Sequence, residues 1–170
     1  RLAALRSGTG ADHKEAAILD GFLNAAGQSI AALSHSIEPP TLGEAVEILS
    51  RAGTVYLIAQ RRSYPISSYM AYAFGKLKVR SLLIGSPAGI DQETLSMAGP
   101  QDAAIAVSFS PYASATVDHA RQLAAQGVPI VAITDSAFSP LAEYAKVWFE
   151  VAEADFSGFR SLSATMALAM

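Results

Sequence analysis

The sequence predicts an α/β fold, specifically a three-layer α/β/α sandwich built on a parallel five-stranded sheet. Five short apolar runs rich in β-branched residues recur along the chain, and helical stretches lie between most of them. Continuous apolar strands that alternate with helices are typical of a parallel sheet covered on both faces. The chain has 170 residues, 51% of them hydrophobic and 16% charged. This size and composition suit one domain with a well-filled core.

The expected elements of the sheet follow one another in a regular order. Strands are predicted over residues 55–59, 82–85, 103–109, 128–134 and 147–151. Helices are predicted between them over residues 66–77, 113–126 and 141–145. Gly127 follows the helix over 113–126 and suits its end, because glycine readily adopts the left-handed conformation common there.

Residues 1–40 are predicted to be a linker and a helical segment in front of a sheet domain over residues 41–170. Residues 7–10, Ser-Gly-Thr-Gly, indicate a linker or turn. From residue 12 onward, apolar residues recur at three- and four-residue spacings, which predicts a helix with one apolar face. The residues of this face are Ile18, Leu19, Phe22, Leu23, Ala26, Ile30 and Leu33.

A second N-terminal helix is predicted after a break at Pro39 and Pro40. Thr41 can cap this helix, with Glu44 three residues on, as in a capping box. Its apolar stripe consists of Leu42, Ala45, Val46 and Leu49.

Composition and charge exclude several classes of protein. The net charge is −3 and the pI is near 5.5, a poor footprint for binding DNA phosphates. The chain has no cysteine, which excludes disulfides and thiolate metal sites. No uninterrupted apolar run approaches the roughly 18 residues of a membrane span. We therefore expect a cytoplasmic protein with no membrane partner.

The two ends of the chain favour a fragment of a longer protein. The chain begins with Arg1 and stops at Met170, inside an apolar run over residues 162–170 that is typical of an unfinished helix. If the whole protein binds DNA, we expect that another segment makes the contact.

Polar residues follow three of the predicted strands, where ligands of open parallel sheets bind. The segment 60–65 follows the first strand, 108–112 follows the third, and 134–136 follows the fourth. In two of these loops a serine precedes a proline and a helix. Such helix starts favour anions, because they offer free N–H donors and partial positive charge. Each serine could instead be a plain helix cap.

Two arginines, Arg61 and Arg62, could add positive charge beside these serines. The alternatives for the pair are a solvated surface turn or a salt bridge between subunits. No cofactor and no metal site is predicted.

Residues 42–170 resemble a sugar isomerase (SIS) domain, in the version found in RpiR/MurR-type bacterial transcription regulators. Residues 55–63 stand where that family has its first strand and Gly-x-Gly-x-Ser loop. Ser108-Phe109-Ser110 is similar to its Ser-x-Ser loop, and residues 127–142 are similar to its next strand and loop. Residues 160–164 are similar to the start of its last helix. The resemblance implies a flavodoxin-like arrangement of the sheet.

The resemblance also implies that Ser63, Ser108 and Ser110 hold the phosphate of a phosphosugar. Arg62 and Ser114 complete the candidate ligand-binding set.

The sequence departs from the family at four positions of these loops. Ala59 and Arg61 replace two glycines, Pro111 replaces a third, and Ala113 stands where a threonine is usual. A carboxylate or a polyol therefore remains an alternative ligand.

The resemblance further implies an effector-sensing domain rather than an enzyme. DNA would be bound by a helix-turn-helix segment outside this fragment, and the domain would associate into a homodimer or tetramer. The amphipathic segment over residues 12–33 is expected to contribute to that interface.

The alternative function is a sugar-phosphate isomerase, which needs a general base. Glu93 is the best candidate, although we favour the alternative that it is an acid in the first turn of a short helix, stabilised by the helix dipole. His13 or His35 would have to come from a neighbouring subunit, and His119 is expected on a solvated helix face. We therefore predict no catalytic residue. A dinucleotide-binding domain is excluded, because residues 60–65 contain no glycine.

Overall fold

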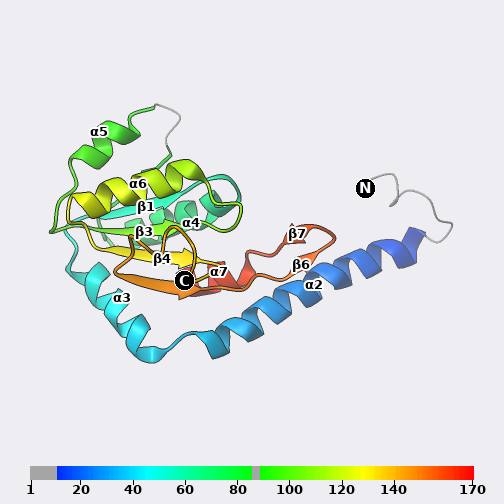
Figure 1. Cartoon of the computed structure of the whole chain (residues 1–170). Coiled ribbons are helices and arrows are strands. Elements are labelled where there is room, and N and C mark those ends of the chain that lie inside the picture. The colour runs from blue at the N-terminus through cyan, green and yellow to red at the C-terminus, as the bar shows by residue number, and fades with distance from the viewer. Residues whose placement is uncertain (1–10, 86–88) are drawn as a thin grey trace.

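The computed structural model describes residues 11–85 and 89–170, and its centre is a five-stranded parallel sheet (Figure 1). The strands lie in the order β2-β1-β3-β4-β5. They are β1 (Val55–Ala59), β2 (Ser81–Ile84), β3 (Ala103–Val107), β4 (Ile130–Thr134) and β5 (Val147–Glu150). This is the flavodoxin-like order of a doubly wound sheet. The predicted fold class is confirmed.

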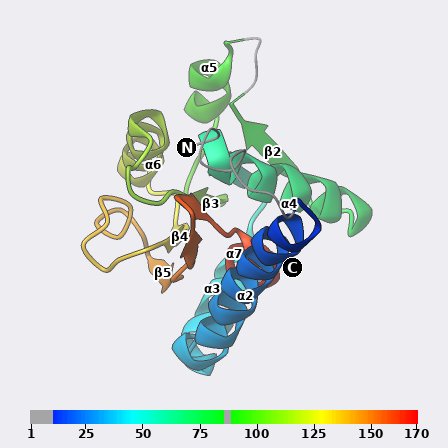
Figure 2. The same cartoon turned by 90° about the vertical axis from the view of Figure 1, so that its right-hand side faces the viewer.

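Helices cover both faces of the sheet, as Figure 2 shows. One layer contains α3 (Pro39–Arg51), α4 (Tyr64–Lys76) and α7 (Ser163–Ala169); the other contains α5 (Asp91–Ser96) and α6 (Ser114–Ala125). Alternate residues of each strand enter the two cores. Leu57, Ile105 and Ile133 face the first layer, for example, whereas Ile58 and Ile130 face the second. Burial on both faces explains why β1, β3 and β4 are continuously apolar.

The predicted helix over residues 141–145 is wrong. This segment forms a series of turns, in which the amide of Ala142 bonds to the carbonyl of Ser139 and that of Tyr144 to the carbonyl of Leu141. Few residues separate Pro140 from β5, so a regular helix has no room to extend. Leu141 is nevertheless fully buried.

The predicted start of α3 is also wrong. Pro39 and Pro40 do not interrupt the chain; they begin the helix, and Glu38 is the residue before it. Proline suits this position because the first amides of a helix have no intrahelical partner. The predicted capping box of Thr41 and Glu44 therefore lies inside the helix. The Gly127 stop is confirmed, with a φ of 79°.

The N-terminal helix α2 (Ala11–Ser36) is long and only partly covered. Ala25 and Ser29 are buried, whereas Leu19 and Leu23 are 57% and 59% exposed. Its N-terminal half extends past the carboxyl edge of the sheet (Figure 1). The helical prediction from residue 12 is confirmed, and the linker predicted over 7–10 lies outside the described residues.

Within the described part of the chain, one stretch of α2, Lys14–Ser36, is long and apolar enough to cross a membrane by length and composition. A single helix of this kind is weak evidence for a span. Asp20 stands inside the stretch, and a charged residue inside a membrane is costly.

A two-stranded hairpin joins β5 to α7 and was not predicted. Its strands are β6 (Asp155–Phe156) and β7 (Phe159–Arg160). Phe156 packs edge-on against Phe22 of α2, with the ring centroids 5.0 Å apart. The hairpin thus lies between the N-terminal helix and the carboxyl edge of the sheet.

Candidate ligand-binding site

A small cavity of about 140 Å³, lined by both polar and apolar groups, lies between the loops that follow β1 and β3. These two strands are neighbours, and the order of the sheet reverses between them. In a doubly wound sheet this switch point is where ligands bind. Pockets for drug-sized ligands measure about 300–1,000 Å³, so this cavity suits one end of a ligand. Its lining residues are Gln60, Arg61, Arg62, Ser63, Ser108, Phe109, Pro111 and Ala113.

The loop after β1 forms one turn of 3₁₀-helix, η1 (Arg61–Ser63), and leads directly into α4. Ser63 is buried and occupies the cap position of α4, yet its side chain makes no capping bond. The plain helix-cap alternative for Ser63 is therefore wrong, and Ser63 is one of the residues that line the cavity. Arg61 has a φ of 54°, a conformation that favours glycine.

Arg62 extends from the same turn across the ring of Phe109, with the guanidinium carbon 5.0 Å from the ring centroid. Burial lowers the pKa of Arg62, and nearby Arg160 lowers it further, whereas Asp135 and Glu153 raise it. Its Nη2 is buried and has no hydrogen-bond partner among the described residues. A buried cationic donor without a partner is costly, and a bound anion would remove that cost.

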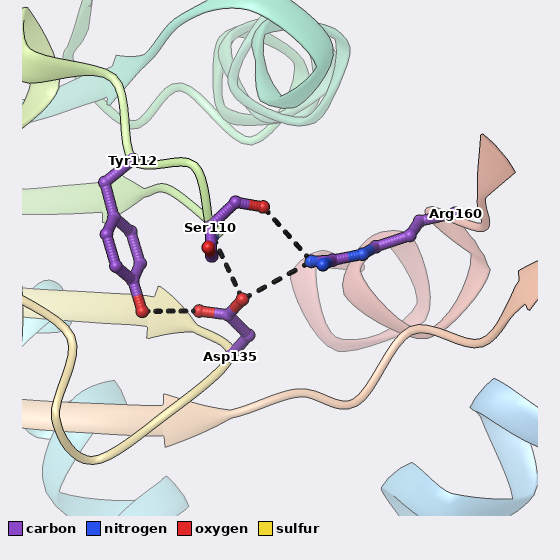
Figure 3. A network of polar contacts seen from close by, with 4 residues as sticks. All are labelled: Ser110, Tyr112, Asp135 and Arg160. Atoms are coloured by element: carbon purple, nitrogen blue, oxygen red, sulfur yellow. Dashed lines mark hydrogen bonds and ion pairs between the residues drawn. The ribbon is translucent and has the colours of Figure 1, made fainter. Parts of the chain in front are cut away.

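The loop after β3 is held by side-chain to backbone bonds. The buried Ser108 Oγ accepts a hydrogen bond from the Ala113 amide, at 3.2 Å, just before α6 begins. Asp135, from the loop after β4, accepts bonds from the Ser110 amide at 3.0 Å and from the Tyr112 hydroxyl at 2.9 Å (Figure 3). Burial, and then the bond to Asp135, raises the pKa of Tyr112.

The structure brings most of the predicted site residues together. Arg62, Ser63 and Ser108 line the cavity. Ser110 is exposed beside Pro111, which also lines it. Ser114 is exposed at the first residue of α6 and does not line the cavity.

Sequence reasoning assigned no role to Asp135 and Arg160, although both belong to the network at this loop. Arg160 Nη1 donates to the carbonyl oxygen of Ser110 at 3.2 Å and lies 3.5 Å from Asp135 Oδ2 (Figure 3). The position of Asp135 directly after a buried strand was a usable signal.

Among the described residues, the candidate bases Glu93, His35 and His119 do not line the cavity. Glu93 is exposed in the first turn of α5, and His35 is exposed in the last turn of α2. The side chain of His13 lies outside the described residues. The prediction that His119 lies on a solvated face is wrong: it is only 7% exposed, and its Nδ1 is buried without a partner among the described residues.

His119 is buried because it stands on the inward face of α6 with Thr116, Ala120 and Leu123. The described residues include no group of three or more histidine, aspartate or glutamate side chains placed to hold a metal ion.

By its fold, this protein is a doubly wound α/β domain with a small cavity at its switch point. Comparison with family models is more specific: the SIS domain model matches residues 48–170. The chain therefore belongs to the SIS domain family. Comparison with curated protein sequences found no match.

Solved structures with the same fold include regulators and an isomerase, all at low identity. The sugar isomerase domain of an RpiR transcription factor from Sphaerobacter thermophilus is 24% identical, with a TM-score of 0.83, over 87% of this chain and 83% of that one. Vibrio vulnificus NanR, in complex with ManNAc-6P, is 20% identical, with a TM-score of 0.80, over 89% of this chain and 59% of that one. A putative sugar-phosphate isomerase from Listeria monocytogenes is 14% identical, with a TM-score of 0.77, over 92% of this chain and 83% of that one.

Proposed function

We propose that this chain is the effector-sensing domain of an RpiR/MurR-type transcription regulator in the cytoplasm and that it binds a phosphorylated sugar or a close analogue. The observation that carries the proposal is the cavity at the switch point, lined by Arg62, Ser63 and Ser108, where the buried Arg62 Nη2 has no hydrogen-bond partner among the described residues. A phosphate offers three strong acceptor oxygens to such donors. The similarity to NanR, solved with ManNAc-6P, supports a sugar phosphate as the ligand class.

A sensor is favoured over an isomerase by the residues around the cavity. Hydroxyls, an arginine and helix starts hold an anion, but moving a carbon-bound proton needs a general base within reach. The carboxylate of Asp135 already accepts bonds from Ser110 and Tyr112, and Arg160 lies beside it. Incubation with ManNAc-6P in deuterated water should give no exchange of the proton next to the carbonyl carbon. Exchange that disappears in Glu93→Gln would establish the isomerase.

Titration calorimetry with ManNAc-6P and with unphosphorylated ManNAc tests the proposed ligand class. We expect binding of the phosphorylated sugar only. Hydrogen bonds to charged groups contribute about 1.5–3 kcal/mol, so Ser63→Ala and Ser110→Ala should each weaken binding roughly tenfold to a hundredfold. Ser50→Ala is the matched control, because its exposed hydroxyl bonds only within α3. Equal affinity in all three variants would move the site elsewhere.

We also propose that the domain forms a homodimer or tetramer through α2. Three exposed apolar residues of this helix, Leu19, Leu23 and Ile30, recur four and seven residues apart and so lie along one stripe. Contiguous exposed apolar surface on a soluble protein commonly marks an interface.

Sedimentation at tens of micromolar should give a dimer or tetramer for the parent chain and a smaller species for Leu23→Lys. The control is Leu77→Lys, which changes another exposed leucine, at the end of α4. A monomeric parent chain would contradict this proposal.

A DNA-binding segment belongs to the proposal only as a separate part of the protein. The net charge of −3 makes this domain a poor electrostatic match for DNA phosphates. In a regulator of this kind, the present domain would supply ligand recognition.

A further inference from the structure

The β6–β7 hairpin is attached to α2 at two places. The Phe156 ring packs directly on the backbone of the helix, since a Cβ at residue 21 would overlap the ring. The amide just before the hairpin, at Ala154, donates to the Ser29 hydroxyl at 2.8 Å, and Ser29 is 1% exposed. A displacement of the hairpin would therefore disturb the packing of α2.

The same hairpin also reaches the ligand site. Arg160, its last residue, extends to the loop after β3, and its Nη1 contacts both the Ser110 carbonyl and the Asp135 carboxylate (Figure 3). Ser110 and Asp135 are themselves joined by a hydrogen bond. One six-residue hairpin thus contacts the candidate ligand loop at one end and the N-terminal helix along its aromatic side.

The contact between Arg160 and Asp135 is weak enough to exchange for another. The two charged atoms are 3.5 Å apart, and the side chains of Arg160 and Asp135 are 40% and 19% exposed. Partly exposed ion pairs of this kind contribute about 0–1 kcal/mol. A phosphate beside Ser110 would offer Arg160 a shorter, charge-assisted hydrogen bond.

Electrostatics favour an anion between two arginines at this edge of the sheet. Arg160 lies close enough to Arg62 to lower the pKa of the Arg62 guanidinium. Two neighbouring guanidinium groups repel each other, and a ligand anion that faces both removes the repulsion. Arg62 is fixed over Phe109, whereas Arg160 belongs to a hairpin and is the more exposed of the pair.

We propose that Arg160 is a second anion-binding residue and that the β6–β7 hairpin transmits occupancy of the site to α2. On binding, Arg160 exchanges its contact with Asp135 for one with the ligand anion. The hairpin then changes its contacts with Gly21 and Ser29 of α2. Binding and the state of α2 are then coupled, and the coupling is reciprocal. This inference rests on the proposed function, because it requires an anion at the Ser110 loop.

The experiment combines titration with hydrogen exchange of the whole chain, using inorganic phosphate and ManNAc-6P as probes. At saturating probe, amides of α2 around residues 21–30 should change their exchange rates beyond any change in α3, the internal control for global stabilisation. Arg160→Gln should weaken binding roughly tenfold, as expected for one charge-assisted bond. It should also abolish the response of α2 when saturation is restored. Arg160→Lys should keep part of the binding affinity and part of the α2 response.

Phe156→Ala separates transmission from binding. It removes the ring from α2 and leaves Arg160 unchanged, so affinity for either probe should stay within about twofold while the α2 response is lost. Binding by the parent chain without a change in α2, or a full response in Arg160→Gln, would overturn this inference alone. A parent chain that binds neither probe would overturn the proposed function and this inference with it.

Discussion

At the amino edge of the sheet, a cavity of about 310 Å³ lies between α3 and the turns before β3 and β4. At the carboxyl edge, the cavity between the loops after β1 and β3 measures about 140 Å³. The larger cavity is lined by polar groups that pair with one another. Glu47 and Arg51 form an ion pair at 2.6 Å, and Asp102 accepts a bond from the Gly99 amide at 3.0 Å.

The smaller cavity differs because one nitrogen of a charged side chain in its lining is buried without a hydrogen-bond partner among the described residues. Among the described residues, Arg62 Nη2 is buried and unbonded there, whereas no residue lining the larger cavity carries such an atom. Buried polar groups are expensive unless they are hydrogen-bonded. Unmet hydrogen-bonding capacity, rather than volume, therefore distinguishes the candidate site from a structural depression.

The largest expected effect is on ligand affinity, and it appears when one arginine at each edge of the sheet is replaced by methionine. Arg62→Met should weaken binding of ManNAc-6P roughly a hundredfold, because a charge-assisted bond contributes about 1.5–3 kcal/mol. Arg51→Met should leave the affinity unchanged, since Arg51 pairs only with exposed Glu47. Titration calorimetry on both variants measures the difference. Equal losses of affinity in Arg62→Met and Arg51→Met would contradict the distinction between a binding site at the carboxyl edge and a structural depression at the amino edge.

A second prediction concerns stability, for which we expect a substitution at the amino edge to have the larger effect. Asp102 is buried and holds the turn before β3 through the Gly99 amide. Asp102→Ala leaves that donor without a partner and should lower the free energy of unfolding by about 1–3 kcal/mol, with no change in the affinity for ManNAc-6P. Urea denaturation measures the loss.

Asp102→Asn is the control, because its amide oxygen can still accept the bond from Gly99. Asp102→Asn should lower the free energy of unfolding by less than Asp102→Ala does. A loss of affinity in either variant would show that the amino edge takes part in binding.

Much of the fold and part of the site could be predicted from the sequence, because both depend on local patterns. Strands buried on both faces are continuously apolar, and the loops that follow them hold Ser63, Ser108 and Arg62. The carboxyl-edge rule for parallel sheets then brought these residues together. The local pattern indicated an anion at these helix starts, and family resemblance supplied the proposed phosphate-binding role of the serines.

The remaining features depend on contacts between distant residues. Arg160 meets Asp135 across 25 residues of sequence, and the two-residue strands of its hairpin are too short to give a periodic pattern. The burial of His119 was different. Thr116, Ala120 and Leu123 recur around it at helical spacing, so the inward face of α6 was readable, but the neighbouring Asp118 suggested a solvated face.

The smallest expected effect compares backbone conformation at the two edges. Gly127, at the amino edge, has a φ of 79°, and a Cβ there would lie 3.3 Å from the Pro100 ring. Arg61, at the carboxyl edge, has a φ of 54° but carries a full side chain. Residues other than glycine pay roughly 1–2 kcal/mol for this conformation, and such strain gathers at functional sites.

We expect Gly127→Ala to lower the free energy of unfolding by roughly 1 kcal/mol. Arg61→Gly should change it by less than about 1 kcal/mol, because relief of strain is offset by the greater freedom of glycine in the unfolded chain. Urea denaturation of both variants measures these values, and titration with ManNAc-6P shows whether the Arg61 side chain also contacts the ligand. A large loss of stability in Arg61→Gly would mean that the arginine holds the loop through its side chain. The left-handed turn after β1 would then be a structural feature like its counterpart at the amino edge.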